Sequence, residues 1–426
     1  MRKVLFLLCL LSFNAVAANV NIGGLGDGTT DETATVQTCL SNAIAGGDTC
    51  VVESGKNYRI VTALYISSAV NLTCADSTAK MTFDMGNIKY PIQVGLTSST
   101  VAGTAWSGTI SNCTFVISAG TSTAGRFIWL AKASGGTITG NSFHPGNLRY
   151  SLTGSGVDGA FLSGAGNYTR TNITITNNIV AAQADTAGSE GIGLEGFTGA
   201  TITGNTVSGV GDDLIGIHLM CSNVLIQNNT LSGVDGRVFI SNSQGVTVNY
   251  NRISRGRAND GLFKTASSLI FVGHETAATN SNTAPKSIII SNNTLTYPEG
   301  ALDSAAAIYM QGPRDTVVYN NTIYSDSSVS TGSCIYHVPF DFTGTWTDPD
   351  GLDTTPAKPR NLVYRANRCI GKYPKTMKMT SAGANHAAPQ SIIDNIGTMS
   401  FYSPAVVTGT LATPPTPTAR TSPTAR

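Results

Sequence analysis

The sequence predicts an all-β chain wound as a parallel β-helix, a solenoid of short strands stacked in coils. Three observations favour this fold: a motif containing Asn that recurs along the chain, an apolar period of two around it, and an abundance of turn-forming residues. The 426 residues include 46 Gly, and Asn, Ser and Thr crowd the middle of the chain. This composition is typical of many short strands and tight turns rather than of helices.

The repeated motif has an apolar residue, two spacers, Asn, one spacer and a second apolar residue. Its Asn positions are Asn141, Asn178, Asn205, Asn229, Asn251, Asn293, Asn321 and, in a weaker copy, Asn367, and Cys113 takes the Asn position of a copy in front of them. The closest copies are 22 to 27 residues apart. An alternating segment such as Thr201-Ile202-Thr203 predicts a short strand with Ile inward. The main alternative, a β-sandwich, would not repeat Asn at the same point after each strand.

Each Asn of the motif follows a strand, where the chain must turn. We expect it to take the left-handed backbone conformation, which most residues cannot adopt. Stacked on the Asn of the next coil, its amide would donate and accept in a ladder, so that a buried polar side chain is satisfied. Each coil would bury its apolar face only against its neighbours, which favours one long domain with many coils.

One amphipathic helix is predicted near the N-terminus. The segment from Thr33 to Ile44 places Val36, Cys39, Leu40 and Ala43 on one face. Such a helix would cap the open end of the solenoid, where an exposed strand edge would otherwise invite aggregation.

Both termini carry segments that we expect to lie outside the β-helix domain, which we place at residues 18–404. Residues 1–17 resemble a secretory signal, because Arg2 and Lys3 precede a short apolar run and a small-residue cleavage site. Residues 405–426 form a Pro/Thr-rich tail that should be disordered. The mature protein should therefore be periplasmic or extracellular.

Seven cysteines remain once the predicted signal is removed, and an oxidising compartment permits disulfides. Closeness in the sequence favours the pairs Cys39–Cys50 and Cys334–Cys369, with Cys74–Cys113 as a further candidate. Spacing does not determine the pairing. One thiol must be left over, and we expect it to be Cys221, buried in apolar surroundings inside the repeat region.

The charge of the chain gives no indication of a charged partner. Only 12% of the residues are charged and the formal net charge is +1, so neither nucleic acid nor an anionic membrane is expected. No segment after the predicted signal is apolar enough to cross a membrane. The sequence has no phosphate-binding Gly loop, Cys-x-x-Cys pair, His cluster at metal spacing or calcium-loop signature. We therefore expect no cofactor, no metal and a monomer.

The segment Gly24-Leu-Gly26-Asp27-Gly28-Thr-Thr-Asp31-Glu-Thr33 precedes the predicted helix, and Val51-Val52-Glu-Ser-Gly55-Lys-Asn-Tyr58 follows it. Together they resemble the N-terminal segment of the pectate lyase superfamily, which includes the polygalacturonase-like glycoside hydrolases. Members of that superfamily are right-handed parallel β-helices. The resemblance spans about residues 20–400 and implies that this chain is a right-handed β-helix as well.

Three short acidic segments recur in the middle of the chain: Ser189-Glu190-Gly191, Gly211-Asp212-Asp213 and Val234-Asp235-Gly236. Glu190 and Asp212 are 22 residues apart, as are Asp213 and Asp235. In a β-helix this spacing would stack four carboxylates on one face. Adjacent coils are about 4.8 Å apart, so acids one or two coils apart bracket the roughly 6.5–9.5 Å between the acid and base of an inverting glycosidase.

The acidic segments are similar to the active-site pattern of the polygalacturonase-like hydrolases over about residues 188–266. That pattern has an Asp before Gly, an Asp-Asp pair, Gly-His-Gly and then Gly-x-Arg-x-Lys-Thr. Glu190 falls at the first position, and Asp212-Asp213 match the second. The resemblance implies that Asp212 is the general acid, while Glu190 and Asp213 position and deprotonate the attacking water.

Two positions depart from the family pattern. Asp235 stands where the family has His, and Leu262 stands where it has Arg, although Lys264 of the same run is kept. In the family that Arg helps to hold a uronate carboxylate. A neutral or differently charged glycan is therefore as good a candidate substrate as galacturonan.

Four residues around the acids are predicted to bind substrate. His218 has the outward parity of its strand, and Asp235 would support the acid in place of the family's His. Arg237 and Lys264 lie just beyond the acids, where they would hold an anionic sugar.

Another interpretation of the acids is that they serve turns, since Asp-Gly and Gly-Asp are common turn pairs. Strict alternation also poses a difficulty, because an inward Ile215 would turn Asp213 inward as well. Asp213 then reaches the surface only if the chain bends at Gly211-Asp212.

The function predicted from these observations is a secreted polysaccharide-degrading enzyme, an inverting glycoside hydrolase of polygalacturonase-like type. One alternative is a polysaccharide lyase that would use Lys264 or an Arg to abstract a proton beside a uronate carboxylate. Another is a non-catalytic adhesin that binds glycans.

Overall fold

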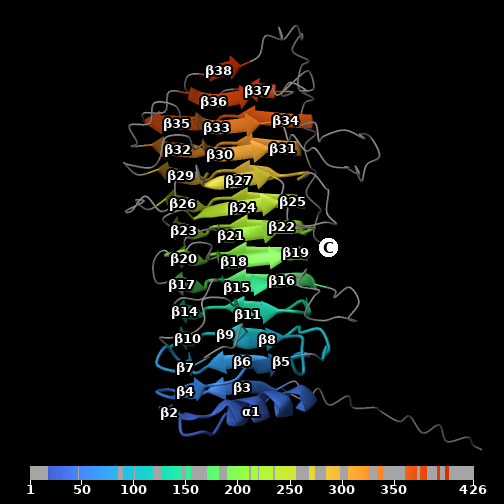
Figure 1. The fold of residues 1–426 in the computed structure, drawn as a ribbon, viewed down its shortest axis with the longest axis vertical. Helices are drawn as coiled ribbons and strands as arrows, with labels where there is room; N and C mark the ends of the chain where they lie inside the picture. The colour runs from blue at the N-terminus through green and yellow to red at the C-terminus, as the bar shows by residue number, and fades with distance from the viewer. Residues whose placement is uncertain are drawn as a thin grey trace, which may run out of the picture.

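The protein, described here from a computed structural model, is a stack of β-coils along one long axis (Figure 1). The structure describes residues 18–46, 48–84, 90–99, 101–118, 126–144, 150–154, 170–181, 190–210, 213–218, 220–233, 236–255, 268–273, 285–297, 306–325, 333–338, 360–371, 375–380, 391–393 and 399–402. The predicted signal and the predicted Pro/Thr-rich tail lie outside these residues, so neither the tail nor the domain boundary at residue 404 is tested.

Three parallel sheets run the length of the stack, and each coil visits them in turn. Sheet A consists of β1 (Asn19–Asn21), β3 (Thr49–Val52), β6 (Asn71–Cys74), β9 (Thr109–Ser111), β12 (Ala133–Ser134), β13 (Thr137–Thr139), β16 (Arg170–Thr176), β19 (Thr198–Thr203), β22 (Ser222–Gln227), β25 (Gln244–Asn249), β28 (Ile289–Ser291), β31 (Arg314–Tyr319), β34 (Arg360–Arg365) and β37 (Ser391–Ile393). Sheet B consists of β2 (Asp27–Asp31), β4 (Asn57–Ile60), β7 (Lys80–Phe83), β10 (Thr114–Ile117), β14 (Ser142–His144), β17 (Ile179–Ala181), β20 (Thr206–Ser208), β23 (Thr230–Gly233), β26 (Arg252–Arg255), β29 (Thr294–Tyr297), β32 (Thr322–Ser325) and β35 (Arg368–Gly371). Sheet C consists of β5 (Leu64–Ile66), β8 (Ile92–Val94), β11 (Arg126–Leu130), β15 (Tyr150–Gly154), β18 (Glu190–Glu195), β21 (Asp213–His218), β24 (Arg237–Ser241), β27 (Ile270–Gly273), β30 (Ala306–Gln311), β33 (Ser333–Val338), β36 (Lys375–Thr380) and β38 (Met399–Tyr402).

The core is the apolar column enclosed by the three sheets. Strand β19 illustrates how the sequence builds it, because Ile202 is buried while Thr201 and Thr203 on either side are half-exposed. The same Ile202 is level with Ile175 of the previous coil and Ile226 of the next. The predicted period-two strands with Ile inward are therefore confirmed, and neighbouring coils supply each other's apolar surface.

The described residues contain one helix, α1 (Thr33–Gly46), which ends two residues later than predicted. Its start is capped by Asp31, whose Oδ1 accepts hydrogen bonds from the Thr33 backbone N–H at 3.0 Å and the Thr33 hydroxyl at 2.7 Å. Val36 and Leu40 of its apolar face are buried. Figure 1 places α1 across one end of the stack, as predicted for a cap.

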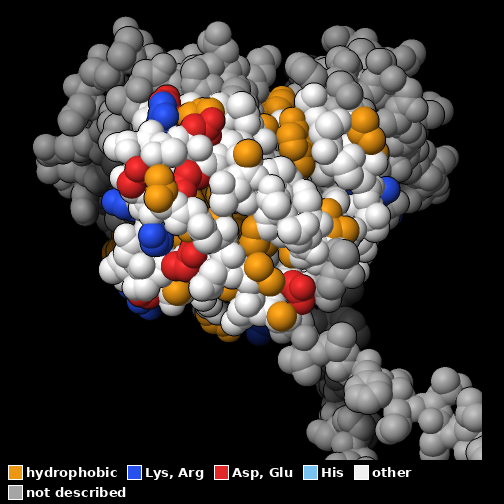
Figure 2. Space-filling model, turned by 90° about the horizontal axis from the view of Figure 1, so that it is seen from below, with side chains coloured by type: hydrophobic (Ala, Val, Ile, Leu, Met, Phe, Trp, Pro, Cys, Tyr) orange, Lys and Arg blue, Asp and Glu red, His pale blue; other side chains and the backbone are white. Residues whose placement is uncertain are grey.

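The capped end presents a mixed surface to solvent. Figure 2 looks along the long axis onto this end, where acidic, basic and apolar side chains are interspersed with other polar ones. None of the helices in the described parts of the chain is long and apolar enough to cross a membrane.

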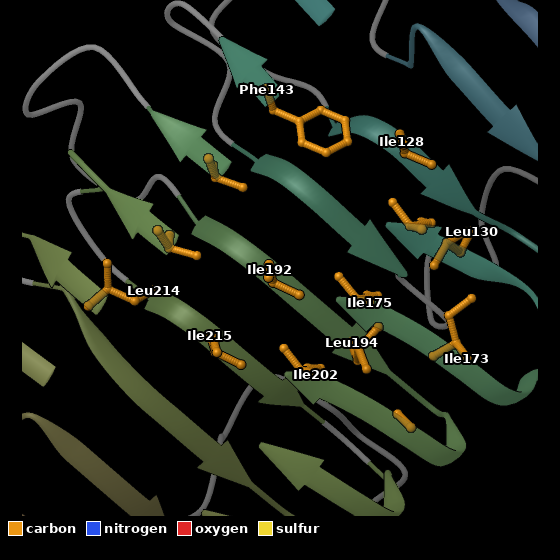
Figure 3. Close-up of a cluster of buried hydrophobic side chains, with 14 of the residues drawn as sticks. Ile128, Leu130, Phe143, Ile173, Ile175, Ile192, Leu194, Ile202, Leu214 and Ile215 are labelled. Carbon is orange, nitrogen blue, oxygen red and sulfur yellow. The ribbon is translucent and has the colours of Figure 1, made fainter. Parts of the chain in front are cut away.

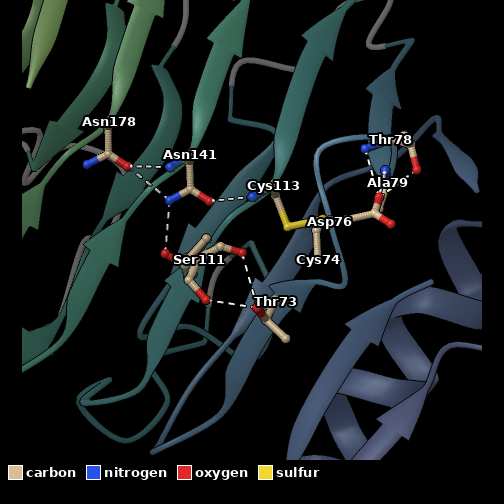
Figure 4. The surroundings of a disulfide bond; sticks show 10 residues. Thr73, Cys74, Asp76, Thr78, Ala79, Ser111, Cys113, Asn141 and Asn178 are labelled. Atoms are coloured by element: carbon tan, nitrogen blue, oxygen red, sulfur yellow. Dashed lines mark hydrogen bonds between the residues drawn. A yellow bond between two sulfur atoms is a disulfide. The ribbon is translucent and has the colours of Figure 1, made fainter. Parts of the chain in front are cut away.

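A ladder of buried Asn side chains runs along the turn between sheets A and B. Asn205 is representative: its Nδ2 donates to Asn229 Oδ1 at 3.0 Å and to the Ile175 carbonyl at 2.9 Å. Its Oδ1 accepts from the backbone N–H and the Nδ2 of Asn178. The ladder extends through all eight predicted Asn positions, and at its front Cys113 donates its backbone N–H to Asn141 Oδ1 at 3.0 Å (Figure 4).

The prediction that the ladder Asn itself takes the left-handed conformation is wrong. The left-handed conformation belongs to the residue before it, such as Asn177 (φ 55°), Gly204 (φ 68°) and Tyr250 (φ 55°). The preceding residue makes the turn, and the ladder Asn is thereby free to point its amide inward, where it stacks on its equivalents.

The cysteine predictions agree with the structure. Disulfides join Cys39 to Cys50, Cys74 to Cys113 and Cys334 to Cys369. Figure 4 shows the second of these beside the first Asn of the ladder. Cys221 is the free cysteine of the described residues and is fully buried. Burial raises the pKa of its thiol to about 12.

Candidate active site

Glu190 and Asp213 occupy equivalent places on neighbouring strands of sheet C. Strands β18 and β21 pair with Ile192 level with Ile215, an offset of 23 residues, so that Glu190 is level with Asp213. The predicted 22-residue register, which made Asp212 level with Glu190, is therefore wrong for this sheet. On the next coil, Asp213 is level with Arg237.

A break in alternation turns Asp213 to the outer face. Leu214 and Ile215 both lie in the core, and Figure 3 shows both side chains within the buried cluster. Because Leu214 and Ile215 both point inward, the residue before them, Asp213, points outward. The pairing with β24 also shifts register between Asp213 and Ile215. The difficulty of an inward Asp213 is resolved in this way, with the irregularity at Leu214-Ile215.

The same irregularity occurs one coil earlier, where Gly191 precedes Ile192 and follows Glu190. A Cβ at Gly191 would lie 2.4 Å from Val207 Cγ1, so this position faces the interior and has no room for a side chain. Glu190 is thereby placed on the outer face in the same manner as Asp213.

Four side chains meet at this place on the outer face of sheet C, and we call Glu190, Asp213, His218 and Arg237 the outward cluster. Arg237 Nε donates to Asp213 Oδ1 at 2.7 Å. His218 Nε2 lies 3.5 Å from Asp213 Oδ2 and 3.7 Å from Glu190 Oε1, within ion-pair range of both carboxylates. The ligand atoms of Glu190, Asp213 and His218 all lie within 4.8 Å of one another.

The cluster is largely withdrawn from solvent. The side chain of Asp213 is 3% exposed, those of Glu190 and His218 are 13% and 14% exposed, and that of Arg237 is 24% exposed. Charges this deeply buried are costly unless they are paired, and the guanidinium of Arg237 supplies the opposite charge beside Asp213.

His218 reaches the carboxylates because the residue beneath its ring is glycine. His218 and Gly216 both face outward on β21, and a Cβ at Gly216 would lie 2.3 Å from His218 Nε2. The imidazole therefore lies back across Gly216 towards Asp213 and Glu190. No feature of the sequence beyond strand parity indicated this role for Gly216.

An aromatic column continues from the cluster along the outer face of sheet C, and consists of Phe239, Phe271, Tyr309 and Tyr336. The ring centroids of Phe239 and Phe271 are 5.0 Å apart, those of Phe271 and Tyr309 are 5.4 Å apart, and both pairs are stacked. Tyr309 and Tyr336 meet edge-to-face at 5.3 Å. The column was not predicted, although Phe239 shares the outward parity of Arg237, a signal that was available in the sequence.

Three of the seven predicted site residues lie outside the described residues: Asp212, Asp235 and Lys264. The other four are the members of the outward cluster. Three of those, Glu190, Asp213 and His218, also offer the oxygen and nitrogen atoms that a divalent cation accepts. The guanidinium on Asp213 opposes a cation there, since it places a positive charge on the same carboxylate.

The right-handed beta helix region is the family model that matches this chain, over residues 99–284. The chain has the right-handed β-helix fold. The fold predicted from the sequence, including its handedness, is thereby confirmed. No curated protein of similar sequence matches the chain.

Solved structures of similar fold carry different functions on this β-helix. The Dettilon tailspike protein is 14% identical with a TM-score of 0.63, covering 91% of this chain and 69% of its own. The catalytic unit of an α-1,3-glucanase from Streptomyces thermodiastaticus is 15% identical with a TM-score of 0.58, covering 90% and 70%. The surface adhesin PfbA of Streptococcus pneumoniae is 14% identical with a TM-score of 0.54, covering 83% and 93%. At such identities the similarity shows the fold, and the function must be argued from the site.

Proposed function

We propose that the protein is a secreted enzyme that hydrolyses glycosidic bonds in a polysaccharide at the outward cluster. The observation that carries the proposal is the meeting of Glu190, Asp213 and His218 within 4.8 Å on the outer face of sheet C. Carboxylates paired across neighbouring coils are the groups that acid–base cleavage of a glycosidic bond requires. The α-1,3-glucanase of similar fold supports a glycan substrate, and the three disulfides support an oxidising compartment.

In this proposal Glu190 and Asp213 act together on the attacking water. Their closest oxygens are within 4.8 Å, shorter than the roughly 6.5–9.5 Å between the acid and base of an inverting enzyme. Glu190 and Asp213 therefore flank and deprotonate a single water. Asp212, the neighbour of Asp213 in the chain, is the general acid that protonates the leaving oxygen.

Arg237, which was predicted to hold an anionic sugar, is proposed instead to act on Asp213. Its Nε donates to Asp213 Oδ1, so its guanidinium orients the base and balances its charge. Because Asp213 balances the charge of this guanidinium, Arg237 attracts a uronate carboxylate less strongly than an unpaired Arg would. Together with Leu262 at the family's Arg position, this favours a neutral glycan as the substrate.

Hydrolysis in ¹⁸O-labelled water tests the reaction class. The purified protein is incubated with a panel of neutral and uronate-containing polysaccharides, and the products are read by mass. We expect new reducing ends that carry one ¹⁸O, since hydrolysis adds water across the bond. Unsaturated, unlabelled products would replace the proposal with a lyase, and binding without cleavage of any polysaccharide would replace it with a glycan-binding adhesin.

The stereochemical outcome tests the shared-water arrangement. Proton NMR of the first product should show inversion at the anomeric carbon. Retention would mean that Glu190 and Asp213 act as nucleophile and acid. In retaining enzymes those two carboxyl groups are roughly 5–5.5 Å apart.

The change Asp212→Asn should lower kcat by about 10²–10⁴-fold if Asp212 is the acid, and full activity of that variant would remove it from the mechanism.

A further inference from the structure

Phe239 occupies the position at which the aromatic column meets the outward cluster. Its ring centroid lies 5.1 Å from that of His218 on one side and 5.0 Å from that of Phe271 on the other. The guanidinium carbon of Arg237 lies 4.5 Å from the same centroid. Phe239 is 8% exposed, yet it lies outside the main apolar core, on the outer face of β24.

These contacts restrict two side chains that touch the carboxylates. The imidazole of His218 is confined between Gly216 beneath it and the ring of Phe239 beside it. The guanidinium of Arg237 gains a cation–π contact with Phe239, which is worth more where water is excluded. Both side chains would otherwise have several rotamers, only some of which place their nitrogens at Glu190 and Asp213.

We propose that Phe239 is the positioning residue of the active site, holding His218 and Arg237 in the orientations in which they meet the two carboxylates. Phe271 supports it by stacking on its far face, at an interplanar angle of 16°. The inference rests on the proposed function for its effect on catalysis. Its structural content, the confinement of His218 by Phe239, stands on the contacts themselves.

The test compares Phe239→Leu with two further variants. The Leu side chain keeps the position apolar but removes the ring that faces His218 and Arg237. Tyr309→Leu is the matched control, because it removes a stacked ring from the same column two coils beyond the cluster. Phe239→Tyr restores a ring and should rescue the Leu variant. Phe239→Met replaces Phe239→Leu if the latter does not fold, as judged by circular dichroism and melting temperature.

Two readouts are made on each variant. The first is the kcat and KM for polysaccharide hydrolysis, where we expect Phe239→Leu to lower kcat at least tenfold and to change KM less than threefold. The second is the rate at which diethyl pyrocarbonate modifies His218, measured by peptide mass. We expect that rate to rise at least fivefold in Phe239→Leu, and to stay within twofold of wild type in Tyr309→Leu and Phe239→Tyr.

The second readout needs no substrate, so the two proposals can fail separately. A wild-type protein that cleaves no polysaccharide, together with faster modification of His218 in Phe239→Leu, would refute the hydrolase and support the positioning role. An active enzyme in which Phe239→Leu matches Tyr309→Leu in both kcat and modification rate would overturn the positioning role and leave the hydrolase in place.

Discussion

The Asn ladder and the outward cluster both place buried polar groups on the same spiral, but they are balanced in different ways. The ladder consists of neutral amides, and each Asn repeats the hydrogen bonds of its neighbour, as Asn205 and Asn229 do. The cluster is charged and is balanced by contacts that belong to its own place on sheet C, such as that of Arg237 with Asp213. The Asn recurs through eight coils, which favours a structural role, whereas the described acids of the cluster lie on two neighbouring coils, which favours a local site.

The position of each set relative to the sheets reinforces this difference. The ladder points inward at a turn, where an unpaired amide would be buried without water. The cluster points outward because two neighbouring strands each place two consecutive residues inward, as at Leu214 and Ile215. The ladder should therefore control stability and leave catalysis unchanged, and the cluster should do the reverse.

The largest effect is expected from removing one Asn of the ladder. Asn229→Ala deprives the Asn205 backbone N–H and Nδ2 of their acceptor and the Ile202 carbonyl of a donor. Each buried polar group left without a partner costs about 1–3 kcal/mol, so the free energy of unfolding should fall by about 3 kcal/mol or more. Urea unfolding measures the loss. The exposed Thr230→Ala on the next strand is the control and should cost less than about 1 kcal/mol.

The folded fraction of Asn229→Ala should retain the wild-type kcat. A large fall in kcat without loss of stability would contradict the division between ladder and cluster.

A smaller effect is expected from Gly216→Ala, and it should fall on activity and not on stability. The new Cβ would lie 2.3 Å from His218 Nε2, and the imidazole can yield by swinging away while the backbone stays in place. The melting temperature should change little, and kcat should fall by about 10–10²-fold because the imidazole leaves the carboxylates. A double-mutant cycle provides the control: in a His218→Gln background, Gly216→Ala should cause no further loss. Equal losses in both backgrounds would mean that Gly216 acts independently of His218.

The smallest effect concerns Cys221, which lies at the turn that follows His218. Burial raises the pKa of its thiol from 9.0 to about 12, so in the folded protein it stays protonated at pH 9 and should resist iodoacetamide. As the pH rises, the thiol loses its proton in the unfolded chain at a lower pH than in the folded protein. The stability that the protonated thiol contributes is therefore fully present below pH 9 and falls as the pH rises towards 12. Mass spectrometry after alkylation at pH 9, with and without urea, checks the first statement. Rapid alkylation of the native protein would contradict the burial.

The sequence was sufficient to predict the fold because its strongest signal is a repeat. The Asn of each copy and Cys113 mark the turn between sheets A and B, and the Ile of Thr201-Ile202-Thr203 marks the inward position of the strand before it. Each was found at its predicted place. The capping helix and the free Cys221 followed from amphipathic spacing and from counting cysteines. The left-handed residue was misplaced by one because Asn itself suits such a turn, and in copies such as Asn177-Asn178 either residue could take it.

Four of the seven predicted site residues lie together in the structure, but the geometry in which they meet was not predicted. The acids and His218 could be selected from their recurrence and parity, but the register of sheet C could not, since the coil there spans 23 residues between Ile192 and Ile215 and not 22. Two consecutive inward residues also violate the period-two rule on which orientation was judged. Contacts such as His218 over Gly216 depend on rotamers, about which sequence patterns carry no information.

The most direct test of the outward cluster as an active centre is the rate of reducing-end release by Glu190→Gln. Asp84→Asn is the matched control, since it also converts a carboxylate to an amide but pairs with Arg59 on another face of the solenoid. The account predicts a loss of about 10²–10⁴-fold for Glu190→Gln with the melting temperature retained, and near-wild-type activity for Asp84→Asn. Equal activity of the two variants on a polysaccharide that the wild type cleaves would contradict it.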